Sequence, residues 1–258
     1  MMSESGIDQN VARFGRFLSH AATHTGMVRR LNEDSYVNRP DLGLWAVADG
    51  AGGHQSGEIA SAEIASALQA IATGLSASQV LAEVRSHLEA THARLRADGA
   101  SRGPGVVMAS TVVVLLARGD HFACLWAGDS RAYLLRGQEL MEISRDHSLV
   151  QELLDSGTIT AEEAEHHPHA NVITRAVGAD CDVLDLDKRT GRLIAGDRLL
   201  LCSDGLCKTL PKAQLAEILA AGDGSGAERL IMAALAAEVH DNVTAITIDC
   251  AAIDHTPI

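Results

Sequence analysis

The fold of this chain is decided by residues 110–136, which read STVVVLLARGDHFACLWAGDSRAYLLR. Three strand-like runs, at 110–117, 121–127 and 131–136, are separated by turn signals at 118–120 and 128–130, each of which contains Gly and Asp. Short runs rich in Val, Leu and aromatic residues that alternate with such turns are typical of consecutive antiparallel strands. The stretch therefore predicts a β-meander.

Long helical segments and further strands surround this stretch. Residues 58–72 and 78–95 are Ala-rich, contain no proline and repeat apolar residues every three or four positions, which predicts two helices. Similar patterns predict strands at 35–38, 43–49, 183–190, 197–203 and 243–248, and helices at 149–156, 211–221 and 226–239. Because strands and helices come in blocks, we expect an α+β fold with helices packed outside antiparallel sheets.

Composition restricts the partners and the location of the protein. The 258 residues include 21 Lys and Arg against 34 Asp and Glu, a net charge of −13, so we expect neither nucleic acid nor an anionic membrane as a partner. With 47% hydrophobic but only 3% aromatic residues, the core must consist mainly of Ala, Val, Leu and Ile. No apolar stretch has the length of a membrane span, and residues 1–16 lack the layout of a signal peptide, so we expect a cytoplasmic protein.

The five cysteines show no metal-binding or disulfide pattern. They are Cys124, Cys181, Cys202, Cys207 and Cys250. Their number is odd, no CxxC spacing occurs, and three of them lie inside apolar runs. We therefore expect reduced thiols, most of them buried.

Four aspartates stand where apolar runs end or begin. They are Asp49, Asp129 and Asp204, which follow such runs, and Asp241, which precedes the last one. Each has a neighbouring Gly or Asn, and for any single pair a turn is the simpler explanation. Several carboxylates at one rim of a core would repel each other unless a cation lay among them, and oxygen ligands suit magnesium, manganese or calcium. The pattern indicates either turns or a carboxylate-walled metal site.

Two polar turns add residues that suit phosphoryl chemistry. Arg29, Glu33 and Asp34 lie within six residues; a surface salt bridge on a helix is one interpretation, and a cationic fork beside metal-binding carboxylates is the other. The second turn, 49–54, has three glycines that let the backbone approach a ligand. No GxGxxG or GK[ST] pattern follows it, which excludes the common nucleotide-binding loops.

Seven motifs in a fixed order resemble one family. They are Val28-Arg29-x-x-Asn32-Glu33-Asp34, Asp49-Gly50-x-Gly52-Gly53-His54-x-x-Gly57-Glu58, Gly128-Asp129-Ser130-Arg131, Asp146-His147-Ser148, Asn171-Val172-Ile173-Thr174-Arg175-Ala176-Val177-Gly178, Ser203-Asp204-Gly205-Leu206 and Asp241-Asn242-Val243-Thr244. Together they resemble the bacterial branch of the metal-dependent protein phosphatase 2C (PPM) family. The resemblance implies two antiparallel β-sheets in a central sandwich flanked by α-helices. It also implies an N-terminal lead-in at 1–22, a single catalytic domain at 23–250 and a C-terminal tail at 251–258.

The resemblance also implies a ligand set for two core Mn²⁺ or Mg²⁺ ions. Asp49 would bridge the ions, and Gly50 would bind one of them through its carbonyl oxygen. Asp204 and Asp241 would bind one ion, and Glu33 the other.

Three more residues receive roles from the resemblance. Asp34 would act through a bound water, Asp129 would bind a weaker third ion, and Arg29 would bind the phosphate. Two divalent ions roughly 3.5–4 Å apart would activate a shared water for attack on phosphorus, so no protein nucleophile is required. We therefore set aside a cysteine-phosphatase mechanism at Cys202 or Cys207, because neither begins a CxxxxxR loop.

The sequence departs from the family pattern at the proton donor and in the flap. Ala51 stands where relatives have Met or a His proposed as general acid, which leaves His54 or a metal-bound water as the donor. The segment 157–171 resembles the family's flap, and its histidines at 166, 167 and 169 are either solvated or zinc ligands. Ala170 replaces a basic residue of many relatives, which weakens the expectation that this flap grips the substrate backbone.

The expected function is hydrolysis of phosphoserine and phosphothreonine in proteins, opposing a bacterial Ser/Thr kinase. Two alternatives stay open: a catalytically weak member that binds phosphoproteins or senses metal, and a phosphoesterase for small molecules. A catalytic domain without fused modules makes a monomer the default expectation.

Overall fold

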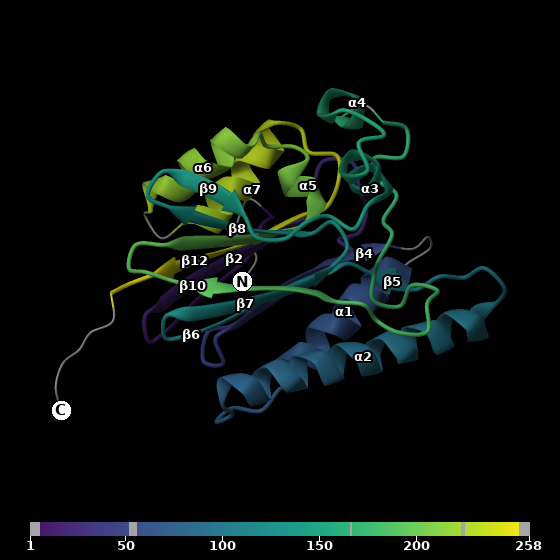
Figure 1. The fold of residues 1–258 in the computed structure, drawn as a ribbon, viewed down its shortest axis with the longest axis horizontal. Helices are drawn as coiled ribbons and strands as arrows, with labels where there is room; N and C mark the ends of the chain where they lie inside the picture. The colour runs from purple at the N-terminus through teal and green to yellow at the C-terminus, as the bar shows by residue number, and fades with distance from the viewer. Residues whose placement is uncertain (1–5, 52–55, 166, 223–224, 253–258) are drawn as a thin grey trace.

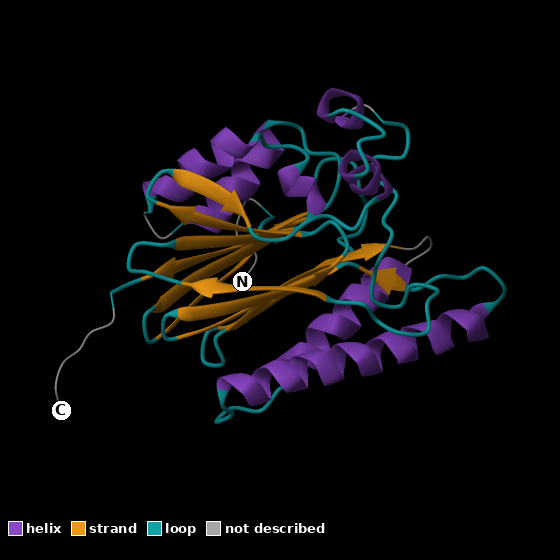
Figure 2. Ribbon diagram, viewed as in Figure 1, coloured by secondary structure: helices purple, strands orange, loops and turns teal. Residues whose placement is uncertain are grey.

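Two six-stranded antiparallel sheets lie face to face, with helices on both outer surfaces (Figures 1 and 2). The computed structural model describes residues 6–51, 56–165, 167–222 and 225–252. The first sheet has the order β1 (Asp8–Phe14), β2 (Phe17–His24), β12 (Val243–Cys250), β11 (Arg198–Cys202), β8 (Arg131–Arg136) and β9 (Glu139–Glu142). The second has the order β10 (Asp187–Arg192), β7 (His121–Ala127), β6 (Val112–Arg118), β4 (Leu44–Ala51) and β3 (Asp34–Arg39), with β5 (Ala109–Ser110) paired to β4. The predicted α+β sandwich is confirmed.

The helices cover the two outer faces and one end of the sandwich (Figure 1). They are α1 (Ser56–Gln69) and α2 (Ala77–Arg102) outside the second sheet, α6 (Lys212–Ala221) and α7 (Gly226–Ala236) outside the first, and α3 (Leu149–Asp155), α4 (Ala161–Glu165) and α5 (Asp204–Cys207) toward one end. Among the residues described here, no helix is both long and apolar enough to cross a membrane.

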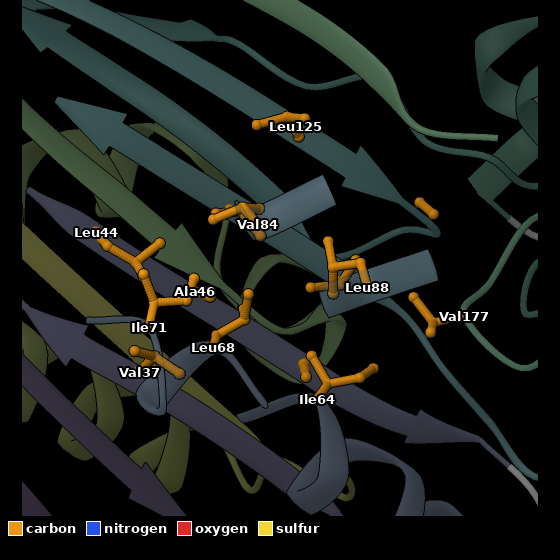
Figure 3. Packing of buried hydrophobic residues seen from close by; sticks show 14 of the residues in the cluster. Val37, Leu44, Ala46, Ile64, Leu68, Ile71, Val84, Leu88, Leu125 and Val177 are labelled. Carbon is orange, nitrogen blue, oxygen red and sulfur yellow. The ribbon is translucent and has the colours of Figure 1, made fainter. Parts of the chain in front are cut away.

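The central strands are buried on both faces, which explains their unbroken apolar runs. In β4, Trp45 and Val47 belong to the core between the sheets, whereas Leu44 and Ala46 pack toward α1 and α2. Figure 3 shows this outer core, in which Ile64, Leu68, Val84 and Leu88 of the two helices surround the strand residues. A third core lies between the first sheet and the helices α6 and α7. Four layers are thus joined by three apolar interfaces.

The predicted meander is wrong at its second turn. β6 and β7 form the expected antiparallel hairpin, but β8 belongs to the other sheet, where it pairs with β9 and β11. Both edges of β7 are already occupied by β6 and β10, so β8 has no free edge to join. Residues 128–130 therefore carry the chain across the sandwich. Gly128 has φ +112°, and a Cβ there would lie 2.5 Å from the Cβ of Thr111.

Residues 1–22 were expected to contain no strand, but the structure has β1 and most of β2 there. β1 is an edge strand whose side chains are mostly exposed, and β2 carries Ser, His and Thr among small alanines, so neither forms an apolar run. β2 nevertheless pairs with β12 along its whole length. Its position in the sheet comes from non-local pairing, which composition does not reveal.

Other boundaries differ more modestly. The strand predicted at 183–190 begins only at Asp187, and Val183 is exposed. The helix predicted at 78–95 continues as α2 to Arg102, and Ser76 caps its N-terminus by accepting a hydrogen bond from the backbone N–H of Gln79. The short elements β9, α4 and α5 were not predicted.

Candidate metal centre

The ends of four strands meet at one rim of the sandwich, on the right in Figure 1. Asp34 begins β3 and lies directly opposite Asp49 of β4 in the antiparallel register. Asp204 follows β11, and Asp241 precedes β12, the antiparallel partner of β11. Four of the predicted carboxylates therefore come to one rim from distant parts of the chain.

Asn242 fastens the turn that carries Arg29 and Glu33 to this rim. Its Oδ1 accepts a hydrogen bond from the backbone N–H of Glu33 at 2.8 Å. Its Nδ2 donates to the carbonyl oxygens of Thr25 at 2.8 Å and Leu31 at 2.9 Å. This buried side chain was not predicted as a site residue, although its place in the Asp241-Asn242 motif was a signal. The start of β12 therefore helps to position this turn.

Asp34 is a buried carboxylate in which one of the two oxygen atoms accepts hydrogen bonds. Its Oδ2 accepts hydrogen bonds from the hydroxyl groups of Ser203 at 2.8 Å and Thr244 at 2.7 Å. Its Oδ1 is buried without a hydrogen-bond partner in the described part of the chain. Burial raises the pKa of Asp34 to about 7, although the two hydrogen bonds lower it. Repulsion from Asp204 and Asp241 adds to the increase. An electropositive ligand at this side chain would remove the penalty.

Asp49 stands at the centre of the carboxylate group. Its backbone N–H donates to the hydroxyl of Thr111 at 3.2 Å, and its carbonyl oxygen accepts from the N–H of Thr111 at 2.8 Å. Burial raises the pKa of Asp49 well above its ordinary value, and repulsion from Asp34, Asp204 and Asp129 raises it further. Full ionisation of the group is therefore costly, and a divalent cation among its members would offset that cost.

Gly50 lets three segments approach closely beside Asp49. A Cβ on Gly50 would lie 2.2 Å from the carbonyl oxygen of Gly57 and 2.7 Å from that of Glu33. A Cβ on Gly57 would lie 2.9 Å from the Glu33 carboxylate oxygen Oε1. The Glu33 backbone thus lies next to Gly50 and the Glu33 side chain next to Gly57, which places oxygen atoms of these segments close together.

Asp129 lies at the crossover between the sheets and is paired with Lys208. The Nζ of Lys208 donates to Asp129 Oδ2 at 3.0 Å, to Asp204 Oδ2 at 2.7 Å and to Asn171 Oδ1 at 3.0 Å. Burial lowers the pKa of Lys208, but attraction to Asp204 and Asp129 outweighs this effect and raises it. Sequence reasoning missed Lys208, although its spacing of four residues from Asp204 in a helical turn was a signal.

Arg29 lies in the turn that Asn242 holds in place, and its side chain reaches the rim. Its Nη2 lies 2.8 Å from Asp241 Oδ2, and half of its side chain is exposed to solvent. Burial lowers the pKa of Arg29, but attraction to Asp241, Glu33 and Asp49 raises it overall. The guanidinium is therefore fixed beside the carboxylates with an open side for an anion.

The donor set fits hard divalent ions. Every predicted ligand offers oxygen, and buried Oδ1 atoms of Asp34 and Asp129 lack a hydrogen-bond partner in the described ranges. Over these ranges, no group of three or more His, Cys, Asp or Glu side chains is arranged so that it could already hold a metal ion. The match is therefore one of ligand chemistry: Mg²⁺ and Mn²⁺ prefer oxygen ligands and complete their coordination with water and substrate oxygens.

Two predictions concern residues at the edge of this rim. His54 lies outside the described residues, so its expected role as proton donor stays a prediction, while Ala51 is the last residue of β4. In the flap, the rings of His167 and His169 lie 5.7 Å apart, and His166 is outside the described residues.

The cysteines are free, as predicted. Cys124, Cys202 and Cys250 are buried, and Cys207 is half-buried. A hydrogen bond with Cys207, together with burial, raises the pKa of Cys202 well above its ordinary value. A thiolate is therefore disfavoured at Cys202.

Known proteins resemble this chain in sequence and in fold. Residues 27–237 match the sequence profile described as Protein phosphatase 2C. The serine/threonine protein phosphatase PstP of Mycobacterium tuberculosis is 36% identical over 247 residues, which are 95% of this chain but 47% of PstP, so the chain spans about half the length of that relative.

Two solved structures resemble the fold at substantial identity. PppA, a key regulatory component of T6SS in Pseudomonas aeruginosa, has a TM-score of 0.84 and 41% identity, covering 94% of this chain and all of that one. The catalytic domain of PstP in complex with two manganese ions has a TM-score of 0.75 and 35% identity, covering 91% of this chain and 98% of that one. With a profile match over most of its length and the motif residues gathered at one rim, the chain belongs to the protein phosphatase 2C family.

Proposed function

We propose that the protein is a metal-dependent serine/threonine protein phosphatase that hydrolyses phosphoserine and phosphothreonine in other proteins. The observation that carries this proposal is the rim where Asp34, Asp49, Asp204 and Asp241 meet beside the half-exposed guanidinium of Arg29. The names of relatives such as PstP support the same activity.

The proposed ligands are oxygen donors from five residues on four segments of the rim. Asp49 would bridge two Mn²⁺ or Mg²⁺ ions, with the Gly50 carbonyl, Asp204, Asp241 and Glu33 as further ligands. When bound, such ions supply Lewis-acid charge that lowers the pKa of a coordinated water and neutralises phosphoryl oxygens. The complex of PstP with two manganese ions supports this stoichiometry.

The residues of this chain have separate tasks in the proposed reaction. Arg29 would exchange part of its contact with Asp241 for a two-pronged contact with phosphate oxygens. Asp34, held by Ser203 and Thr244, would orient a water through its free Oδ1. The proton for the leaving serine or threonine oxygen would come from His54 or from water, since Ala51 has no proton to give.

The proposed biological setting follows from this chemistry. The substrates would be proteins that an opposing Ser/Thr kinase has phosphorylated. The enzyme would act in the cytoplasm as a monomer. The similarity to PppA, a regulatory component of T6SS, favours a regulatory role for this phosphatase.

Hydrolysis of a phosphothreonine peptide, free phosphoserine and an aryl phosphate tests the proposal. We expect turnover of the peptide with Mn²⁺, none with EDTA, and recovery when Mn²⁺ is restored. Activity that survives chelation would contradict the metal-dependent mechanism. Peptide turnover no faster than that of free phosphoserine would instead indicate a small-molecule phosphoesterase, and ion binding with no turnover of any substrate would indicate a binding or metal-sensing member.

A further inference from the structure

One ammonium group is enclosed by oxygen atoms at the edge of the rim. Lys208 Nζ lies 2.7 Å from Asp204 Oδ2, 3.0 Å from Asp129 Oδ2 and 3.0 Å from Asn171 Oδ1. A lysine ammonium has three N–H donors, and here each has one acceptor. The side chain therefore uses its full hydrogen-bonding capacity within the site.

The backbone holds Lys208 in this position. Its N–H donates to the carbonyl oxygen of Asp204 at 2.8 Å, which closes the helical turn that begins after β11. The acceptors come from three separate parts of the chain: the helix α5, the crossover at Asp129 and the flap end at Asn171. One positive charge thus links the crossover and the flap to the proposed metal ligand Asp204.

Asp129 needs a cation at this place. It is 2% exposed, and a buried carboxylate is stable as an ion only when it is paired. Within the described part of the chain, Lys208 is the cationic side chain in an ion pair with Asp129. The charge that Asp129 would otherwise take from a divalent ion is therefore already supplied by the protein.

We propose that Lys208 is a built-in cation that replaces the third metal ion expected at Asp129, so that the protein binds two divalent ions. This inference rests on the proposed function, since it takes the two-ion core as given. An ion bound to Asp129 and Asp204 together would lie within a few ångströms of the ammonium, and like charges at that range repel strongly. Lys208 is then a positioning residue that keeps Asp129, Asp204 and the end of the flap together without a third metal ion.

Counting bound Mn²⁺ ions tests the inference without relying on activity. Isothermal titration calorimetry and the loss of the free-Mn²⁺ electron paramagnetic resonance signal both give the number of ions per chain. We expect two ions for the natural protein, three for Lys208→Met, and two for Lys208→Arg, which keeps the charge. The double variant Lys208→Met/Asp129→Asn should return to two, because the ligand of the additional ion is removed.

Lys212→Met is the matched control, since Lys212 is exposed at the start of α6 and lies four residues further along the chain. It should bind two ions. If Lys208→Met does not fold, as judged by circular dichroism, Asp129→Asn in the natural background replaces it and should also leave two ions.

Each contrary result has a distinct meaning. Three ions in the natural protein would overturn the inference, and would assign the unpartnered Oδ1 of Asp129 to the third ion. Two ions in a folded Lys208→Met protein, or loss of an ion in Asp129→Asn, would overturn it as well. Absence of Mn²⁺ binding from the natural protein would instead contradict the proposed function itself.

Discussion

The strand β11 has an aspartate just beyond each end, and the two are held very differently. Asp197 precedes the strand and is fully paired: Arg136 donates two hydrogen bonds to it, at 2.9 and 2.7 Å, and the Ile194 N–H donates a third at 2.8 Å. Beyond the other end, Asp204 adjoins Asp34, whose Oδ1 has no partner in the described ranges and whose pKa is raised.

The difference separates a structural carboxylate from a functional one. A buried carboxylate whose lone pairs are all taken can contribute to stability, whereas several half-satisfied carboxylates in contact destabilise the protein until a cation binds. Burial alone does not distinguish the two ends, since Asp197 is 1% exposed and Asp34 is 7% exposed. The two ends differ in the number of carboxylate oxygens without a hydrogen-bond partner and in the charge of the neighbouring side chains.

The largest expected effect is on catalysis at the rim. Asp204→Asn should lower kcat/KM for a phosphothreonine peptide by about a thousandfold, or ~4 kcal/mol of transition-state stabilisation, because a proposed metal ligand loses its charge. Thermal unfolding in EDTA should change little, since repulsion with Asp49 is relieved while the Lys208 pair is lost. A large fall in melting temperature would mean that this end is structural too.

The metal-free protein should lose stability as pH rises. The folded pKa of Asp34 is about 7, above the ordinary value of 3.8, so the folded state retains a proton that the unfolded state releases. The favourable contribution is complete below about pH 4, declines from there to about pH 7, and amounts to roughly 4 kcal/mol. Unfolding in urea with EDTA from pH 4 to 8 measures it, and Asp34→Asn should make the profile less steep, with the part due to Asp49 remaining. An equally steep profile in the variant would contradict this assignment.

At Asp197, before the start of β11, we expect a loss of stability without a loss of catalysis. Asp197→Asn should lower the free energy of unfolding by about 2 kcal/mol, because Arg136 loses a buried anionic partner while remaining partly hydrated. Activity per folded molecule should stay within about twofold, as the residue is remote from the rim. Denaturant melts and kinetics on the same preparations test both statements. A selective loss of activity would break the distinction between the two ends.

A smaller effect is expected for Arg29→Lys, which keeps the charge but not the planar fork. We expect kcat/KM to fall about tenfold, since a lysine cannot contact two phosphate oxygens in the same way. Arg30→Lys, at the exposed neighbouring position, is the matched control and should behave like the natural protein. Equal effects at both positions would point to general electrostatic attraction and not to phosphate binding at Arg29.

The types of residue in the site could be read from the chain, but their state of charge could not. Asp49, Asp204 and Asp241 were predicted because each adjoins an apolar run that became β4, β11 or β12. Lys208 and Asn242 were missed because their roles depend on partners 79 and 209 residues away, Asp129 and Glu33. No local pattern encodes such a distance.

The same dependence on distant partners limits how much of the fold can be predicted from the sequence. The sequence by itself determined which segments are strands or helices wherever burial on both faces produced apolar runs, and its ordered motifs determined the family. Only the tertiary structure decided that β8 crosses to the other sheet, that the polar strand β2 pairs with β12, and that Lys208 lies between Asp129 and Asp204. Hydrophobic period is a property of neighbouring residues, whereas strand pairing and charge compensation are properties of surfaces that exist only once the chain is folded.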